Sequence, residues 1–212
     1  MRIRMLLVTA AVSALALVWA SPASAAVSHS EAVGALLTAN EVGNNWHKVA
    51  VSDGMSGMLT GCASAQYTSK GIDAKAARAF QFRQQETFIT ERLKSFDTPK
   101  LAGREVRKWV ARYSDCSSFT HDGQTFTITK AKVGDFADAT AAFKIKGIVT
   151  DSEGVEAPVT AILVGAKWGH HVVSAATVVV GGLTSAQVTE LRKSTIRVAK
   201  VSLEKVDNKL GR

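Results

Sequence analysis

The sequence has only two cysteines, Cys62 and Cys116, and its one long hydrophobic run lies within the first 25 residues. Two thiols are too few for a cysteine-rich metal site. The most apolar stretch of the remaining chain, Val172 to Val180, is too short for a membrane helix, which needs about 20 residues. We therefore expect no membrane span in residues 26–212.

The sequence also lacks the common catalytic motifs. It contains no H-E-x-x-H zinc motif, no phosphate-binding glycine loop and no complete G-x-S-x-G elbow. His170 and His171 are adjacent, and neighbours on a strand point to opposite faces, so that strand alone cannot present both to one metal ion. We expect no enzyme activity, no metal site and no cofactor.

The first 25 residues have the three parts of an export signal. Arg2 and Arg4 form a positive start, residues 5–20 are almost uninterruptedly apolar, and Ala23-Ser24-Ala25 is an A-x-A cleavage site. An uncleaved membrane anchor is the alternative, but the apolar run is shorter than a bilayer span and no basic segment follows it. The residue directly after the cleavage site is Ala26 and not a cysteine, so no lipid anchor can be attached there. We predict residues 1–25 as a signal peptide and a secreted, extracellular location.

The charge of the chain limits its partners only loosely. The formal net charge is +8, and loss of Arg2 and Arg4 with the signal lowers it to +6. The basic residues are dispersed, without the dense run of a nucleic-acid tail, so we expect no nucleic-acid partner. A modest positive charge suits anionic lipid headgroups or wall polymers, and solubility explains it equally well.

The two cysteines indicate a disulfide. In exported proteins an even cysteine count is typical of bonded pairs, and we predict Cys62–Cys116. The loop it closes is long, so the chain-entropy model gives about 4 kcal/mol of stabilisation. A metal site would need more ligands at short spacing, and a nucleophilic cysteine would leave the other one unexplained.

Capping signals and periodicity predict the secondary structure. Capping boxes that begin at Ser28, Thr38 and Thr184 predict three helices, the last of them reaching about residue 206. Thr98-Pro99 begins another helix, which ends just before Cys116. Residues 51–71 are expected to form a loop. Alternating or apolar stretches predict strands at 77–83, 88–96, 125–129, 141–149, 158–168 and 171–180.

These elements predict an α+β fold. Strands joined by short turns favour an antiparallel sheet, and the strands 158–168 and 171–180 belong in its centre because they are apolar on both faces. We predict one domain over residues 26–212, with about six strands, helices packed on one face and a cleft on the other.

Several short segments resemble one family, the PknH-like extracellular sensor domains of actinobacterial receptor kinases. The opening Leu36-Leu37-Thr38, Glu41-Val42-Gly43 and Trp46 resembles that family's "LLT…EVG…W". Similar features follow in the same order along nearly the whole of residues 26–212: Gly61-Cys62, the helix ending at Cys116, Gly134-Asp135, and an apolar strand pair before a C-terminal helix.

The resemblance implies a cleft over the sheet and a sensing or ligand-binding role without catalysis. Members of the family often carry two disulfides, whereas this chain can form one. No kinase and no transmembrane segment follow the signal, so we expect a secreted, stand-alone protein that binds a ligand or a partner.

Four residues are candidates for ligand binding on the open face of the sheet. Lys144 and Lys146 alternate with apolar residues and are placed on that face, and Arg83 shows the same polarity in an earlier strand. Trp168, at the end of a central strand, packs in the core or forms a platform at the mouth of the cleft. Basic side chains with alkyl stems suit a small amphiphile with an anionic head or another cell-envelope component. Ordinary solvated strand faces are the alternative.

The function expected from the sequence is therefore a secreted, non-catalytic ligand-binding or sensor-like protein. Two alternatives remain open: a secreted hydrolase with an unrecognised site, and an inhibitor or partner-binding protein that acts through its surface. An apolar groove favours the ligand-binding protein. A perturbed acid or histidine pair in that groove favours the hydrolase, and a flat exposed apolar patch favours the inhibitor.

The signal peptide leads to the first testable prediction. We expect the mature protein to begin at Ala26, because the A-x-A site ends at Ala25. Intact-mass measurement of the protein recovered from culture medium checks this expectation. Recovery of the intact chain, beginning at Met1, from the membrane fraction would contradict it.

Overall fold

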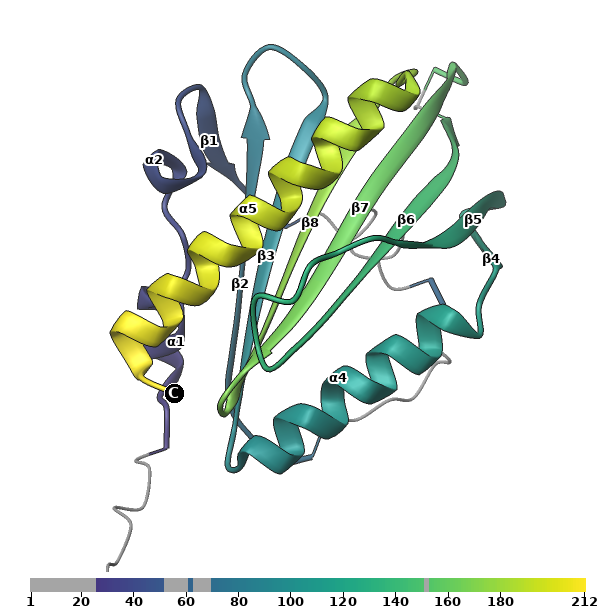
Figure 1. Ribbon diagram of the computed structural model, residues 1–212. Coiled ribbons are helices and arrows are strands. Elements are labelled where there is room, and N and C mark those ends of the chain that lie inside the picture. Colours follow the sequence, from purple (N-terminus) through teal and green to yellow (C-terminus); the bar gives the residue numbers. More distant parts are fainter. Residues whose placement is uncertain (1–25, 52–60, 63–69, 151–152) are drawn as a thin grey trace, which may run out of the picture.

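The computed structural model describes residues 26–51, 61–62, 70–150 and 153–212 (Figure 1). The expected signal peptide and most of the expected loop at 51–71 lie outside these residues. The helices are α1 (His29–Gly34), α2 (Ala39–Val42), α4 (Pro99–Ser114) and α5 (Ser185–Leu210). The strands are β1 (Trp46–Val49), β2 (Ile72–Phe82), β3 (Thr87–Phe96), β4 (Ser118–His121), β5 (Gln124–Ala131), β6 (Ala139–Thr150), β7 (Glu156–Trp168) and β8 (His171–Val180).

All described strands belong to one antiparallel sheet, with the order β1-β2-β3-β8-β7-β6-β5-β4. The predicted α+β class and antiparallel pairing are confirmed, and β7 and β8 lie in the centre as expected. The predicted number of about six strands is wrong, because the sheet has eight. The two missed strands, β1 and β4, are its edges. Each has only four residues, so neither shows a period long enough to recognise.

A turn signal does mark β4 in the sequence. Asp122-Gly123 joins β4 to β5, and both residues adopt left-handed backbone angles, with φ of 49° and 77°. Such angles define the tight hairpin turns for which Asp-Gly is a preferred pair. The hairpin could therefore have been predicted from these two residues.

The helices pack on both faces of the sheet, which corrects the expectation of one covered face (Figure 1). In β7, Val159 and Leu163 pack in the cluster under α4, whereas Ile162 and Val164 pack in a cluster with α5. The physical reason is that β7 and β8 are apolar on both faces. Each face must therefore be covered to keep these side chains from water.

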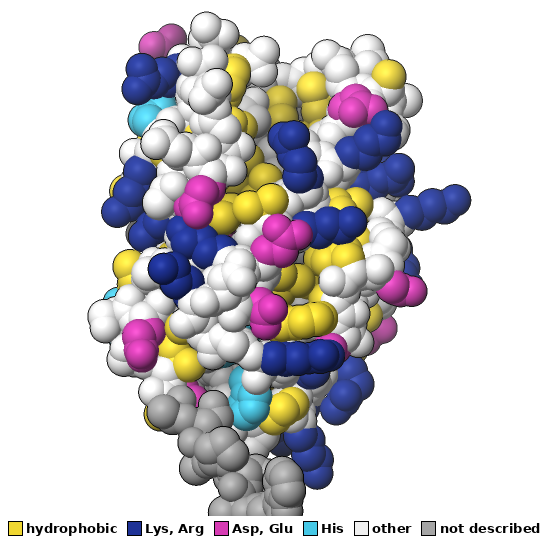
Figure 2. Space-filling model, turned by 60° about the vertical axis from the view of Figure 1, so that its left-hand side comes forward, with side chains coloured by type: hydrophobic (Ala, Val, Ile, Leu, Met, Phe, Trp, Pro, Cys, Tyr) yellow, Lys and Arg dark blue, Asp and Glu magenta, His cyan; other side chains and the backbone are white. Residues whose placement is uncertain are grey.

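The face covered by α5 also carries the two short N-terminal helices. Contacts of α1 are mainly with β2 and with α5, and α2 lies beside β1. In Figure 2 the left-hand side of Figure 1, where α1 and α2 lie, has turned forward. Lys and Arg side chains gather in the upper right of this view. No helix within the described residues is long and apolar enough to span a membrane.

A buried carboxyl group fastens the helices to the sheet. Glu91 of β3 has no exposed surface, and it accepts hydrogen bonds from the Leu37 N–H at 2.8 Å and from the Ser202 hydroxyl of α5. Burial raises the pKa of Glu91. The opposite residue on β2, Arg78, donates to the carbonyl oxygens of Val33 and Leu36, both at 3.3 Å. Glu91 thus connects β3, the α1–α2 link and α5.

A second carboxyl group holds the C-terminus against the sheet. Asp138, just before β6, accepts hydrogen bonds from Lys167 Nζ at 2.7 Å, Gly169 N at 2.9 Å and Arg212 at 2.5 Å. The Lys167 hydrogen bond is the largest cause that lowers the pKa of Asp138 to about 2. The ionised form is therefore favoured in the folded protein.

We predict that Asp138→Asn destabilises the fold near neutral pH and has little effect near pH 2. A lowered pKa contributes stability above the ordinary carboxyl pKa, and this contribution is lost as the pH falls through the folded value. Melting temperatures of both proteins from pH 7 downward measure the difference. The exposed Asp135 supplies a control, Asp135→Asn, which should leave the profile unchanged. A constant difference at all pH values would contradict this account.

Candidate ligand-binding groove

The face that carries α4 is only partly covered by it. The helix lies over the second half of β7, where Trp109 contacts Gly165, and the first half of β7 borders an open groove. Residues of six strands, β3 to β8, line this groove, whose volume is about 1290 Å³. Its apolar lining consists of Phe88, Phe126, Ile148, Val149, Val159, Val178 and Val180. The structure thus has a groove, but it lies beside α4 and not, as was expected, on a face without helices.

Aromatic rings fill the region between α4 and the groove because two glycines let them lie close to the sheet. A Cβ at Gly147 would lie 2.4 Å from Cδ1 of Phe126, and one at Gly165 would lie 2.8 Å from Cζ3 of Trp109. Phe119 stacks on Phe126, with ring centroids 5.1 Å apart. The glycines thus allow a ring to pack flat against the strands, and Phe126 forms part of the groove lining.

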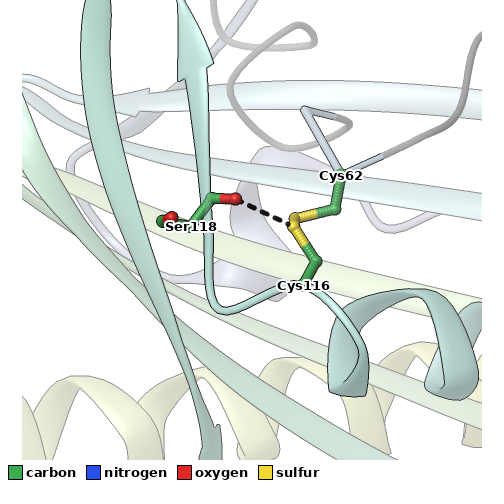
Figure 3. Close-up of a disulfide and its surroundings, with 3 residues drawn as sticks. All are labelled: Cys62, Cys116 and Ser118. Carbon is green, nitrogen blue, oxygen red and sulfur yellow. Dashed lines mark hydrogen bonds between the residues drawn. A yellow bond between two sulfur atoms is a disulfide. The ribbon is translucent and has the colours of Figure 1, made fainter.

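The disulfide packs beside this aromatic region, and Figure 3 shows the bond, with Ser118 next to it. The structure confirms the predicted bond between Cys62 and Cys116, whose Cα atoms are 6.0 Å apart. Cys116 lies two residues after the end of α4, and its sulfur lies 3.4 Å from the carbonyl oxygen of Ser118 at the start of β4. The bond therefore holds the end of α4 and the start of the β4–β5 hairpin, which forms part of the groove rim.

The rim of the groove is polar. The β4–β5 hairpin contributes His121, Asp122 and Gln124, and the ends of β6 and β7 contribute Thr150 and Glu156. His121 Nε2 lies 3.2 Å from a carboxyl oxygen of Asp122. Polar and acidic side chains therefore surround an apolar floor. This arrangement suits a ligand with an apolar body and a polar end.

The structure does not bring the four expected binding residues together. Lys144 and Lys146 point to the α5 side of the sheet, opposite the buried Phe143 and Ile145, and line a smaller hollow there. Their expected place on an open face without a helix is corrected, because α5 packs on that face. Lys146 borders both the groove and this hollow. Arg83 follows β2 near the opposite edge of the sheet.

Trp168 lies at the far end of β7 from the groove. Its indole N–H donates to Asp207 of α5 at 2.8 Å, and the Arg212 guanidinium lies over the ring at 4.2 Å from its centroid. The side chain packs against the cluster under α5. These contacts hold the C-terminal end of α5 on the sheet, which corresponds to the packing role that the sequence left open.

One carboxyl group with a raised pKa, that of Asp73, also lies away from the groove. The hydrogen bond with Asp97 is the largest cause that raises the pKa of Asp73, with His170 nearby. Asp73 lies near the start of β2 and Asp97 follows β3, whereas the groove borders the other end of β3 at Phe88. Within the described residues, no three His, Cys, Asp or Glu side chains are arranged to hold a metal ion.

These features define an α+β domain with one antiparallel sheet, helices on both faces and a groove beside α4. The fold is similar to that of the extracellular domain of PknH from Mycobacterium tuberculosis. The two structures superpose with a TM-score of 0.53 at 15% sequence identity, over 84% of this chain and 99% of that one. At this identity the likeness shows the fold alone. No protein-family model and no curated protein matches the sequence.

The contact between Gly147 and Phe126 leads to a prediction about the groove lining. Gly147→Ala places a methyl group where the ring now lies, so the ring must move and the fold should lose about 1–3 kcal/mol. Urea unfolding measures the change. Gly134→Ala is the matched control, because nothing lies within 4 Å of a Cβ there. Equal stabilities of the two variants would contradict the close packing of Phe126 on β6.

Proposed function

We propose that this chain is an exported, non-catalytic binding protein that takes the apolar part of a small amphiphile into the groove beside α4. The observation that carries the proposal is the groove itself, about 1290 Å³ of space against a floor of valine and phenylalanine side chains. Ligand sites are typically concave, mainly apolar and bordered by a few polar groups.

The apolar floor supplies the main binding energy in this proposal. Each buried methylene contributes about 0.8 kcal/mol, so a chain of about ten would contribute roughly 8 kcal/mol. That gross value corresponds to about micromolar affinity before the entropic losses of association are subtracted. The ligand's polar end remains at the rim, near His121 and the carboxyl groups of Asp122 and Glu156. Lys146 also borders the groove, so the rim can take a carboxylate head beside Lys146 as well as a head that donates hydrogen bonds to the carboxyl groups.

Three observations support the sensor-like and exported parts of the proposal. The first 25 residues read as a signal peptide, and the disulfide between Cys62 and Cys116 suits an oxidising compartment. The PknH structure with a similar fold is an extracellular domain. Together they favour a binding protein that meets its ligand outside the cytoplasm.

The hydrolase alternative would need a perturbed acid or histidine pair at the groove. The contact between His121 and Asp122 at the rim joins two adjacent residues of a hairpin, and the Asp122 side chain is 81% exposed. The carboxyl pair of Asp73 and Asp97 lies at the other end of the strands. Tyr113 belongs to α4, and burial of its phenol against the sheet raises its pKa to about 12, so it stays neutral at ordinary pH. We therefore favour binding over catalysis as the function of the groove.

A charged side chain placed in the groove tests the proposal. Val180→Lys puts an ammonium group among the apolar lining, and it should weaken binding of a fluorescent fatty acid about tenfold or more, because the charge must lose water. Val49→Lys on β1 is the matched control, since Val49 is also half-buried but lies at the edge of the sheet. Fluorescence titration measures both affinities, and circular dichroism verifies folding.

Two outcomes would contradict the proposal. One is the absence of fatty-acid binding by the wild-type protein when mass spectrometry also finds no amphiphile on protein from native medium. The other is an equal loss of affinity in Val180→Lys and Val49→Lys, which would mean that the probe binds elsewhere.

A further inference from the structure

A second hollow lies on the α5 face, between the first turns of α5 and strand β6. Its volume is about 330 Å³. Five of the residues that line it are basic: Lys130, Lys132, Lys144, Lys146 and Arg192. No Asp or Glu is among the described residues that line it. We call this site the lysine hollow.

Three elements supply the basic side chains. Lys144 and Lys146 alternate along β6 and so point to the same side of the sheet. Lys130 and Lys132 lie at the end of β5, past the point where β4 stops pairing with it. Arg192 comes from the second turn of α5. Lys130 pairs with the α4-facing Phe143, so the side chains that face α5 here are those of Lys144, Lys146 and Arg192, while Lys130 and Lys132 border the edge of the hollow.

The wall formed by α5 adds further positive potential. Ser185, Val188, Thr189 and Arg192 follow the i, i+3, i+4, i+7 spacing and therefore lie along one side of the helix. They belong to the first two turns of a 26-residue helix, where the aligned peptide dipoles give a partial positive charge. The buried Ile162 forms part of the floor. The hollow therefore has an apolar base, and the charged residues that line it are all basic.

The five basic residues have no ion pair with any residue that the structure describes. Other lysines do: Lys167 pairs with Asp138, Lys205 with Glu41, and Lys193 with Glu190, each at 2.7 Å. Like charges around one hollow repel each other, and an anion between them would remove that repulsion. The arrangement is thus complementary to a ligand with several negative charges.

We propose that the lysine hollow binds a compact, soluble molecule that carries two or more phosphate groups. A volume of about 330 Å³ is at the lower end of the range for small-molecule sites. Ammonium and guanidinium groups form strong charge-assisted hydrogen bonds with phosphate oxygens. The hollow faces the opposite side of the sheet from the groove, so the proposal does not rest on the proposed function.

The surroundings favour a soluble ligand over a membrane surface. Ile148 and Val155, the exposed large apolar residues among those described, lie near the turn between β6 and β7. That turn also carries the exposed Glu153 and Glu156. Acidic side chains beside the apolar ones would be repelled by anionic lipids, so this edge suits a lipid surface poorly.

Calorimetric titration with pyrophosphate tests the proposal on the purified, exported protein. We expect saturable binding at about 20 mM salt that weakens strongly at about 300 mM, since salt screens exposed charges. The double variant Lys144→Gln, Arg192→Gln should bind about tenfold or more weakly. It retains Lys146, which also borders the groove, so binding of the fatty-acid probe should be unchanged. Lys144→Arg keeps the charge and should keep the affinity.

The control Lys75→Gln, Lys100→Gln removes the same net charge at two exposed positions on β2 and α4. It should bind pyrophosphate within about twofold of wild type. An equal loss in both double variants would overturn the proposal, because net charge alone would then explain binding. Absence of pyrophosphate binding would also overturn it. So would sedimentation with phosphatidylglycerol vesicles that depends on Lys144 and Arg192 while pyrophosphate does not compete.

Discussion

The structure depends on one constraint, which is that β7 and β8 are apolar on both faces. A sheet with such central strands is stable in water only when both faces are covered, and here α4 covers one and α1 with α5 the other. The two covers differ in length. α4 has 16 residues and α5 has 26. Because α4 ends at Ser114 and is bonded through Cys116, it cannot reach the first half of β7, and the apolar surface left there becomes the groove.

The position of α5 is set by polar contacts as well as by apolar packing. The hydroxyl group of Thr195 hydrogen-bonds to that of Thr177 at 2.8 Å. About two turns further along α5, Ser202 donates to Glu91. All four residues are buried. A buried polar group without its partner would be costly, so α5 cannot slide or rotate on the sheet without breaking both contacts. With α5 held in this way, its first turns lie beside Lys144 and Lys146, and the lysine hollow follows from that placement.

Much of the fold was readable from the sequence, because local signals marked most elements. Thr98 caps α4 by accepting from Leu101 N, Thr184 caps α5, and the central strands begin and end within a few residues of their predicted limits. The covering of both faces was also implied by the apolar pattern of β7 and β8, and the prediction of one covered face overlooked it. The groove was harder to predict. Its lining combines Phe88, Phe126 and Val180 from distant segments, and no spacing in the sequence reports that they meet.

The two candidate sites are connected through the register of a single strand. Along β6, Phe143 and Ile145 point toward α4, whereas Lys144 and Lys146 point toward α5. Because side chains alternate, a shift of one residue would bury the lysines under α4 and expose the phenylalanine. Gly147 opposes such a shift, since the ring of Phe126 on β5 packs where any Cβ would lie. One glycine without a side chain therefore keeps the apolar residues in the core on one face and the basic residues at the hollow on the other.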